Sequence, residues 1–207
     1  MHRIGLTGGI ASGKSTVTEL LQAAGALILD ADLLAHELMQ PEGPAYAEIL
    51  TAFGPDILQP DGQIDRQKLG AHVFENPAAL ARLNACVHPH VHAALRARSQ
   101  SLASAAAQAD KNWLLISAIP LLYENKLESL FDKVLVVYCS ENQQMQRLMA
   151  RNQLSENAAR QRIAAQLPIE SKKARADAVI DNSGTLEQTH NQVKQWLGEF
   201  SWDTYVV

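Results

Sequence analysis

Short apolar runs and amphipathic stretches alternate along the chain, and this pattern predicts an α/β fold. Runs such as Ala26-Leu27-Ile28-Leu29, each followed by a polar turn, are typical of buried strands. After residue 14, apolar residues recur at helical spacing and predict a helix with one apolar stripe, which Gly25 ends. Five strands are predicted in this way, over residues 4–7, 26–29, 113–117, 134–138 and 178–180.

The stretch from about residue 33 to 92 contains no clear strand. It separates the second and third strands by far more chain than an ordinary crossover needs, so it is either a helical insertion that holds a second substrate or an elaborated crossover. Pro89 is expected to open a long helix that continues through Arg96 and Arg98. The other helices predicted here cover residues 33–39, 44–53 and 65–74, with one more starting at Asn76-Pro77.

The first strand runs into a complete G-x-x-x-x-G-K-[ST] phosphate-binding loop (the P-loop), which spans residues 8–15. Glycines let the backbone approach a ligand, and the N–H groups of the loop and of the following helix surround an anion. Lys14 is expected to reach the β- and γ-phosphates of a nucleotide, and the Ser15 hydroxyl to bind Mg²⁺. A turn that only connects strand to helix has no need of these two residues. The predicted nucleotide-binding residues are Gly9, Ala11, Ser12, Gly13, Lys14, Ser15 and Thr16.

Two carboxylates, Asp30 and Asp32, follow the second strand directly. They lie at the carboxyl end of that strand, which is the edge of an open α/β sheet where ligands bind. Asp32 is the candidate general base or metal-linked carboxylate, and Asp30 is expected to support it. The alternative is that both acids cap the helix that starts at Leu33.

Composition narrows the class of protein. The 207 residues are 47% hydrophobic, enough for one sizeable core, and carry 18 Lys and Arg against 22 Asp and Glu. The resulting net charge of −4 argues against a chain-wide affinity for nucleic acid. Cys86 and Cys139 are isolated in apolar surroundings and are interpreted as buried free thiols. No apolar run is long enough for a membrane span and no signal peptide is visible, which predicts a soluble cytoplasmic protein.

The segment from Arg147 to Arg175 is locally basic although the protein as a whole is acidic. Arg147 and Arg151 are four residues apart and share one face of a predicted helix. Arginine forks stabilise the charge that develops on a transferring phosphoryl group. Together with the P-loop, this segment is interpreted as a lid over a triphosphate, whereas without the loop it would be interpreted as an ordinary solvated helix pair.

Two further polar positions are candidates for ligand contacts. His88 belongs to His88-Pro89-His90-Val91-His92, which lacks the acidic or cysteine partners of a metal site. His88 is therefore a candidate contact for an anionic ligand, or else a capping histidine. Asn182 follows the fifth strand, where it is a candidate adenine contact or a common turn residue.

Taken together, these residues resemble the dephospho-CoA kinase family over about residues 3–198. One departure is Ala11, where the family usually has glycine; alanine is expected to fit with a negative φ. The stretches that carry the resemblance are residues 4–15, Asp30-Ala31-Asp32, His88-Pro89, Pro120-Leu121-Leu122-Tyr123-Glu124, Arg147, Arg151, residues 162–166, Ala176-Asp177 and Ile180-Asp181-Asn182.

The resemblance implies a P-loop three-layer α/β fold of the nucleoside monophosphate kinase type, in one domain. It combines a five-stranded parallel sheet, a helical insertion that binds the substrate and a mobile helical lid. The core then covers about residues 1–32, 93–146 and 177–207, the insertion about 33–92 and the lid about 147–176.

The resemblance also implies a reaction, in which the ribose 3′-hydroxyl of 3′-dephospho-CoA attacks the γ-phosphate of ATP to give CoA and ADP. In that reaction Lys14 holds phosphates, Asp32 activates the 3′-hydroxyl and Arg147 stabilises the transferring group. ATP and Mg²⁺ are the implied cofactors, and dephospho-CoA is the partner, with neither nucleic acid nor membrane, and with a monomer expected. The implied acceptor-binding residues are Asp32, His88, Pro120, Leu121, Leu122, Glu124 and Arg151.

Two other functions compete with this one. Another small-molecule kinase of the same fold, acting on a nucleoside monophosphate or shikimate, would need a different acceptor pocket. A nucleotide-dependent switch of the GTPase kind usually has a metal-binding Asp after its third strand and an Asn-Lys-x-Asp base-reading motif, and the sequence has neither.

Overall fold

The computed structural model describes residues 1–74 and 76–205. The chain forms two compact units, one made of Met1–Leu29 with Leu102–Val207 and the other of Asp30–Ser101. The first unit carries the P-loop and the sheet. The predicted insertion over 33–92 lies within the second unit.

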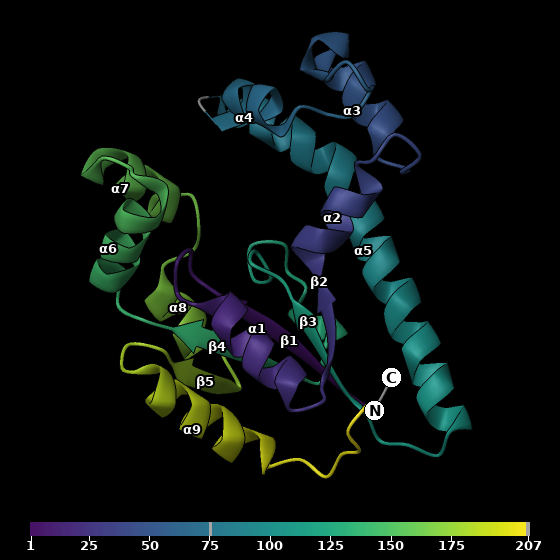
Figure 1. The fold of residues 1–207 in the computed structure, drawn as a ribbon, viewed down its shortest axis with the longest axis vertical. Helices are drawn as coiled ribbons and strands as arrows, with labels where there is room; N and C mark the ends of the chain where they lie inside the picture. Colours follow the sequence, from purple (N-terminus) through teal and green to yellow (C-terminus); the bar gives the residue numbers. More distant parts are fainter. Residues whose placement is uncertain (75, 206–207) are drawn as a thin grey trace. The chain divides into compact units, whose positions relative to one another are not determined.

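The sheet has five strands in the order β2-β3-β1-β4-β5, which places the strand that enters the P-loop at its centre (Figure 1). The register pairs Ile4 of β1 with Ile116 of β3 and with Lys133 of β4, and the printed pairings are all parallel. The predicted strands are thus confirmed, with ends that differ by a residue or two. Their bounds are β1 His2–Gly8, β2 Leu27–Asp30, β3 Leu114–Ala118, β4 Lys133–Tyr138 and β5 Ala178–Asp181.

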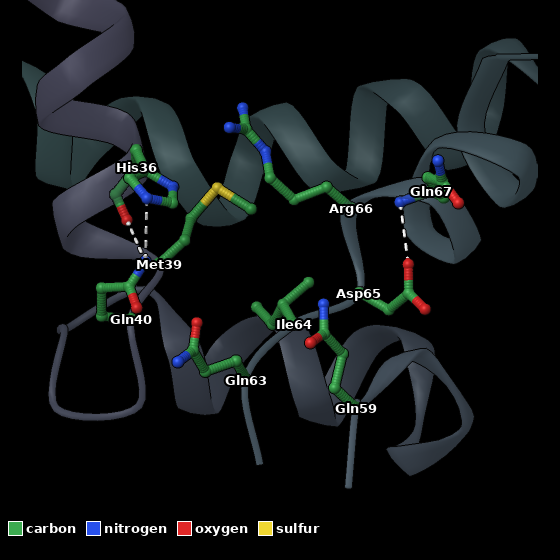
Figure 2. Close-up of a pocket in the computed structure, with 9 residues that line it drawn as sticks. All are labelled: His36, Met39, Gln40, Gln59, Gln63, Ile64, Asp65, Arg66 and Gln67. Atoms are coloured by element: carbon green, nitrogen blue, oxygen red, sulfur yellow. Dashed lines mark hydrogen bonds between the residues drawn. The ribbon is translucent and has the colours of Figure 1, made fainter. Parts of the chain in front are cut away.

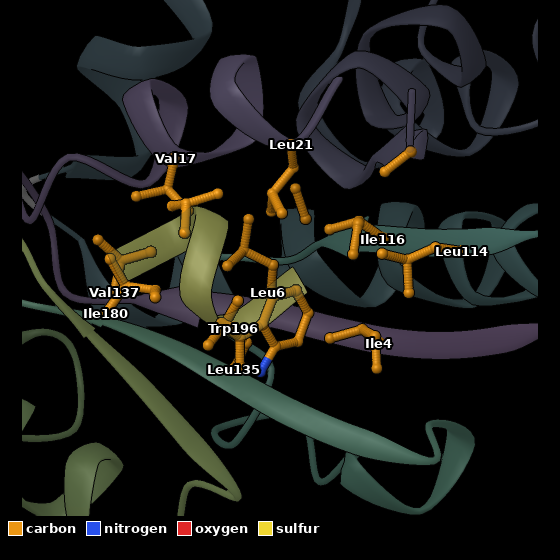
Figure 3. Close-up of a cluster of buried hydrophobic side chains, with 13 residues drawn as sticks. Ile4, Leu6, Val17, Leu21, Leu114, Ile116, Leu135, Val137, Ile180 and Trp196 are labelled. Carbon is orange, nitrogen blue, oxygen red and sulfur yellow. The ribbon is translucent and has the colours of Figure 1, made fainter. Parts of the chain in front are cut away.

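Two helices, α1 (Lys14–Ala23) and α9 (Leu186–Leu197), pack side by side against one face of the sheet. Alternate residues of the strands point to this face, so each strand contributes every second side chain to one core. Figure 3 shows Trp196 of α9 reaching into this cluster. The core comprises Ile4, Leu6, Val17, Leu21, Ala26, Leu114, Ile116, Ala118, Leu135, Val137, Ile180, Val193 and Trp196.

The opposite face of the sheet is also buried, as expected of a parallel sheet covered on both sides. Leu115 and Val136 on this face are nearly inaccessible. Gly5 of β1 is needed here because a Cβ at this position would lie 2.6 Å from a methyl group of Leu122 and 2.7 Å from the Phe131 ring. Helix α8 (Ile169–Ala174) packs against β4, and a short 3₁₀ helix, η2, covers Glu128–Leu130.

Two further helices of the first unit, α6 (Glu141–Asn152) and α7 (Glu156–Ala164), pack against each other (Figure 1). Ser140 caps α6 in a capping box with Gln143, and Ser155 caps α7. Both caps agree with the sequence, and α6 begins before residue 147, where the lid is predicted to start.

The second unit is helical. Asp65 caps α4, because its Oδ1 accepts the N–H groups of Gln67 and Lys68, and the 3₁₀ helix η1 packs against α3 and α4. The elements are α2 Ala31–Leu38, α3 Tyr46–Phe53, η1 Pro55–Ile57, α4 Arg66–Phe74 and α5 Pro77–Gln108, of which residues 102–108 belong to the first unit.

The expected helix start at Pro89 is wrong, because α5 runs without a break from Pro77 through Pro89. Proline removes one backbone hydrogen bond and usually kinks or ends a helix. Here Pro89 is solvent-exposed, while Val87, Val91 and Leu95 on the apolar face are all buried. Burial of that continuous face offsets the lost hydrogen bond, so the helix persists.

Candidate active site around the P-loop

The P-loop is shaped by two left-handed residues between β1 and α1. Gly13 has φ 94° and forms the N-cap of α1. No side chain caps this helix, so its first backbone N–H groups and the positive end of its dipole are left to an anion. Lys14 and Ser15 are the first two residues of α1, and Ser15 is exposed. These features are what phosphate binding requires.

Ala11 has φ 58°, so the expectation of a negative φ at this position is wrong. The residue lies in a tight turn in which the Ser12 N–H donates to the Gly9 carbonyl over 3.1 Å. The loop imposes the left-handed conformation, and alanine adopts it at a cost of about 1–2 kcal/mol relative to a right-handed conformation.

Ala11→Gly is therefore expected to stabilise the protein. Relief of the left-handed strain exceeds the extra entropy of glycine in the unfolded chain, which leaves about 0.5–1 kcal/mol of net stabilisation. Urea unfolding measures the change. The matched control is Ala23→Gly in the last turn of α1, where the backbone is helical and the same exchange is expected to destabilise by about 0.5–1 kcal/mol. Equal effects at the two positions would contradict the strain at Ala11.

Two glutamine side chains hold the tip of the P-loop at Ile10. Gln166 accepts the Ile10 N–H at 2.8 Å, and Gln144 of α6 donates to the Ile10 carbonyl at 2.9 Å. Gln144 is buried, and a Cβ at Gly9 would lie only 1.9 Å from its Nε2. Gly9 is thus required by the close approach of a side chain that fixes the loop.

The carbonyl of Ser12 is held by Asn182 and Arg147. The buried Asn182 amide donates to Ser12 O at 2.8 Å, and its Oδ1 accepts the Thr189 hydroxyl at 2.8 Å. Arg147 donates to the Asn182 carbonyl at 2.8 Å and approaches Ser12 O at 3.5 Å. The polar atoms of the Asn182 side chain are therefore engaged within the protein. An adenine contact by this residue stays a prediction, and the contacts shown indicate support of the loop.

Lys172 of α8 is fully buried beneath the start of the P-loop. Its Nζ lies 2.8 Å from Glu124 Oε1 and donates to the carbonyls of Pro120, at 3.1 Å, and Gly8, at 3.4 Å. These three acceptors match the three N–H donors of an ammonium group. Glu124 Oε1 also accepts the Leu167 N–H at 2.9 Å. One ion pair thus ties α8 and the segment before it to the ends of β1 and β3.

The stretch from Pro120 to Glu124 is predicted to shape the acceptor site, and its members differ in placement. Leu122 is fully buried and Glu124 is paired with Lys172, whereas Pro120 and Leu121 are half-buried. The Pro120 carbonyl also accepts the Thr7 hydroxyl at 3.1 Å. Contacts of this stretch with an acceptor remain predictions, which the half-exposed Pro120 and Leu121 fit better than Leu122.

Arg151 is placed differently from Arg147. It is exposed near the end of α6, where its Nε donates to the side chain of Asn152 at 2.9 Å. Of these two arginines, the structure thus brings Arg147 to the P-loop backbone, and an acceptor contact of Arg151 stays a prediction.

Asp30 and Asp32 belong to the second unit. Asp30 is the N-cap of α2, because its Oδ1 accepts the N–H groups of Asp32, at 2.8 Å, and Leu33, at 3.3 Å. The capping alternative is therefore confirmed for Asp30. Asp32 lies in the first turn with an exposed side chain, which is compatible with contact to a substrate.

His88 lies inside α5, so it does not cap a helix. Its ring is 5.9 Å from the ring of His92, and His90 pairs with Glu48 at 2.9 Å. Burial, together with the charges of His88 and Arg96, lowers the pKa of His92. The contact of His88 with an anion remains a prediction.

Two other titratable groups of the first unit are poor candidates for a base. Burial raises the pKa of the Cys139 thiol, whose Sγ lies 4.0 Å from the Ala11 carbonyl. Burial also raises the pKa of Tyr123 to about 12, although the Arg175 guanidinium stacks 4.2 Å from the centre of its ring. Both groups therefore stay protonated at neutral pH.

Gln144 and Lys172 were not singled out by sequence reasoning. Both are polar residues on amphipathic helices that would ordinarily face water, and no local pattern marks them as buried. The available signal is the spacing of Gln144 and Arg147, three residues apart and therefore on one face of α6.

Within the described ranges, no group of three or more His, Cys, Asp or Glu side chains is arranged to hold a metal ion. No helix in the described part of the chain combines the length and the apolar character of a membrane span.

Known proteins resemble this chain both in sequence and in structure. A family model described as dephospho-CoA kinase matches residues 2–188. A dephospho-CoA kinase from Carboxydothermus hydrogenoformans is 47% identical over 199 residues, covering 96% of this chain and 94% of its own. A solved structure from Thermus thermophilus is 34% identical with a TM-score of 0.77, covering 97% of this chain and 98% of its own. Dephospho-CoA kinase from Campylobacter jejuni is 28% identical with a TM-score of 0.66, covering 96% of each chain.

Proposed function

The chain belongs to the dephospho-CoA kinase family, and from this premise we propose which of its residues perform the phosphoryl transfer. The enzyme transfers the γ-phosphoryl group of ATP to the ribose 3′-hydroxyl of 3′-dephospho-CoA, giving CoA and ADP, in the last step of coenzyme A synthesis. The observation that carries the assignment is the family match over residues 2–188, on a chain whose P-loop has the geometry of a phosphate site.

The P-loop binds the phosphates of ATP. Its backbone N–H groups and the uncapped N-terminus of α1 face the anion, and Lys14 neutralises charge on the β- and γ-phosphates. Gln144, Gln166 and Asn182 hold the loop in this shape before ATP arrives, so little binding free energy is lost in ordering it. Arg147, which already lies against the loop backbone, stabilises the charge of the transferring group.

The residues at the start of α1 fit Mg²⁺, because Ser15 presents an exposed hydroxyl oxygen there and Mg²⁺ prefers oxygen ligands. We assign Ser15 as a ligand of this ion. When bound, Mg²⁺ neutralises charge on the phosphates.

Asp32 acts on the acceptor. As an exposed carboxylate in the first turn of α2, it accepts the proton of the 3′-hydroxyl as the oxygen attacks phosphorus. Its N–H is bonded to the capping Asp30, so the backbone under it is fixed.

The helices of residues 147–176 form the lid, which excludes water and limits hydrolysis of ATP.

The free thiols Cys86 and Cys139 fit a reducing compartment, and we place the enzyme in the cytoplasm.

The direct test is an assay of acceptors. The purified protein is incubated with Mg²⁺ and ATP, with dephospho-CoA in one tube and nucleoside monophosphates or shikimate in others, and the products are identified by mass. Gain of one phosphoryl group by dephospho-CoA alone supports the proposal. Transfer to another acceptor alone would overturn the acceptor assignment, and ATP binding without any transfer would favour a nucleotide switch.

Lys14→Ala is expected to lower kcat/KM by about 10²–10³-fold, because the loop loses the cation that meets the β- and γ-phosphates. The fold should remain, since the side chain is partly exposed at the first residue of α1. Steady-state kinetics measures the loss, and circular dichroism checks the fold. Lys126→Ala, at an exposed turn after the 120–124 stretch, is the control for loss of a positive charge. Unchanged turnover in Lys14→Ala would contradict the assigned role of the loop.

A further inference from the structure

The pocket shown in Figure 2 belongs to the second unit and has a volume of about 380 Å³. The end of α2, residues 59–65 and the start of α4 line it. These residues fall within the 33–92 stretch that is already expected to bind the substrate, so the pocket adds no separate site. The P-loop of the first unit has a feature that its sequence motif does not explain, which is a turn held in a conformation that its own residues disfavour.

This turn is formed by residues 9–12. The Ser12 N–H donates to the Gly9 carbonyl, which closes the turn, and Ala11 is the third residue, with φ 58°. A positive φ at the third position is typical of a type II turn, which favours glycine there. In a type I turn the same residue has a negative φ, which alanine prefers. The two forms differ by a flip of the peptide between Ile10 and Ala11, and the closing hydrogen bond is present in both.

A buried amide holds this peptide in the orientation that alanine disfavours. Nε2 of Gln144 donates to the Ile10 carbonyl at 2.9 Å, and Gln144 is only 2% exposed, so the carbonyl is turned into the protein. In a trans peptide the C=O and the following N–H point in opposite directions. The Ala11 N–H is therefore turned outward, to the side from which a ligand can approach.

The same arrangement recurs two residues later in the loop. The Asn182 amide donates to the Ser12 carbonyl at 2.8 Å, so the Gly13 N–H is turned away from it. The amide is packed so closely that a Cβ at Gly13 would lie 1.9 Å from its nitrogen. Glycine adopts the φ of 94° at this position readily, whereas Ala11 does not adopt its positive φ readily. Of the two amides, Gln144 is thus the one that acts against the preference of the backbone.

The two opposing effects are similar in size. A positive φ disfavours alanine by about 5- to 30-fold in an equilibrium constant. Flipping the peptide takes the Ile10 carbonyl away from Gln144, and a buried donor without an acceptor disfavours the flipped form by about 5- to 150-fold. The presence of the Gln144 amide therefore decides which form of the turn is populated.

We propose that Gln144 is a positioning residue for phosphoryl transfer, because it keeps the Ala11 N–H, and not the Ile10 carbonyl, turned toward the phosphates of ATP. The inference rests on the proposed function, since it takes a triphosphate as the ligand of the loop. Without the Gln144 amide the peptide flips, and a carbonyl oxygen replaces one N–H in the anion site. That oxygen repels the phosphate oxygens. Gln144 acts through the loop and takes no part in the chemical step.

The test compares Gln144→Met with Gln146→Met, a control that makes the same exchange at an exposed position of α6. Isothermal titration with Mg²⁺ and a non-hydrolysable ATP analogue gives the dissociation constant. Gln144→Met is expected to weaken binding about tenfold, the loss of one N–H donor to a charged group, with a similar fall in kcat/KM for ATP. Gln146→Met should bind the analogue like the wild type. Crystal structures without nucleotide should show a negative φ at residue 11 in Gln144→Met.

Rescue at the strained residue separates control of the turn from a general structural role. Glycine accepts a positive φ without the amide, so Ala11→Gly should recover most of the affinity lost in Gln144→Met. The gain from Ala11→Gly should be larger in that background than in the wild type, which a double-mutant cycle measures.

A second pair of variants leaves Gln144 in place and tests the turn even if Gln144→Met does not fold. Asparagine and threonine are close in size, but asparagine tolerates a positive φ and the β-branched threonine does not. Ala11→Thr is therefore expected to bind the analogue about tenfold more weakly than Ala11→Asn.

Several results would overturn the inference alone, in a wild type that binds ATP and phosphorylates dephospho-CoA. These are equal affinities of Gln144→Met and Gln146→Met, a loss in Gln144→Met that Ala11→Gly does not reduce, a positive φ at residue 11 of Gln144→Met, and equal affinities of Ala11→Thr and Ala11→Asn. A wild type that bound the analogue but phosphorylated only another acceptor would contradict the proposed function and leave this inference standing. A wild type that did not bind the analogue would overturn both.

Discussion

Asp32→Asn is expected to lower kcat by about 10²–10⁴-fold, the usual contribution of a positioned general base. Asparagine is close to aspartate in size and cannot take a proton at neutral pH. The affinity for ATP should be nearly unchanged, because the P-loop residues that bind the phosphates are untouched. Steady-state kinetics over dephospho-CoA and ATP, with equilibrium binding of ATP, separates the two effects.

Asp30→Asn is the matched control for Asp32→Asn. It removes a negative charge two residues away, and asparagine caps a helix about as well as aspartate, so α2 should keep its start. Most of the activity should therefore survive. If kcat and ATP affinity fell together in Asp32→Asn, the carboxylate would hold metal or structure and would not be a base. Equal losses in the two variants would assign the effect to the local charge alone.

Much of the fold follows from local sequence patterns. Each strand of the sheet is a short apolar run, and the P-loop is fixed by glycines at set positions, because such features depend on residues close together in the chain. The start of α6 was likewise predictable, since the side chain of Ser140 caps a helix within one turn. These parts of the site needed no knowledge of the tertiary structure.

Other features depend on contacts between residues far apart in sequence, and local patterns do not contain them. Gln144 and Lys172 are buried because they meet the P-loop backbone, more than 100 residues away. The left-handed Ala11 is imposed by its turn, and the helix through Pro89 persists because its apolar face is buried. In each case tertiary structure outweighs the local preference of the residue.

Lys172→Met is expected to destabilise the protein by about 3–5 kcal/mol, the largest stability change among these predictions. The substitution keeps an unbranched side chain of similar length but leaves Glu124 with a partly buried, unpaired charge, and it removes the ammonium donor from the carbonyls of Gly8 and Pro120. For a chain of 207 residues this corresponds to a fall in Tm of roughly 10 °C. Thermal unfolding followed by circular dichroism measures it.

Two further variants separate the ion pair from general effects of the substitution. Lys173→Met removes the neighbouring exposed lysine, which lies 3.9 Å from the Tyr138 ring centre, and should cost about 1 kcal/mol or less. The double variant Lys172→Met with Glu124→Gln should recover part of the lost stability, because no unpaired charge is left beneath the loop. The P-loop should still be misplaced in the double variant, since no ammonium group then holds Gly8. A small shift of the loop costs up to about 10²-fold in rate, so kcat should stay low while Tm recovers. A Lys172→Met protein as stable as Lys173→Met would show that the ion pair does not anchor the loop.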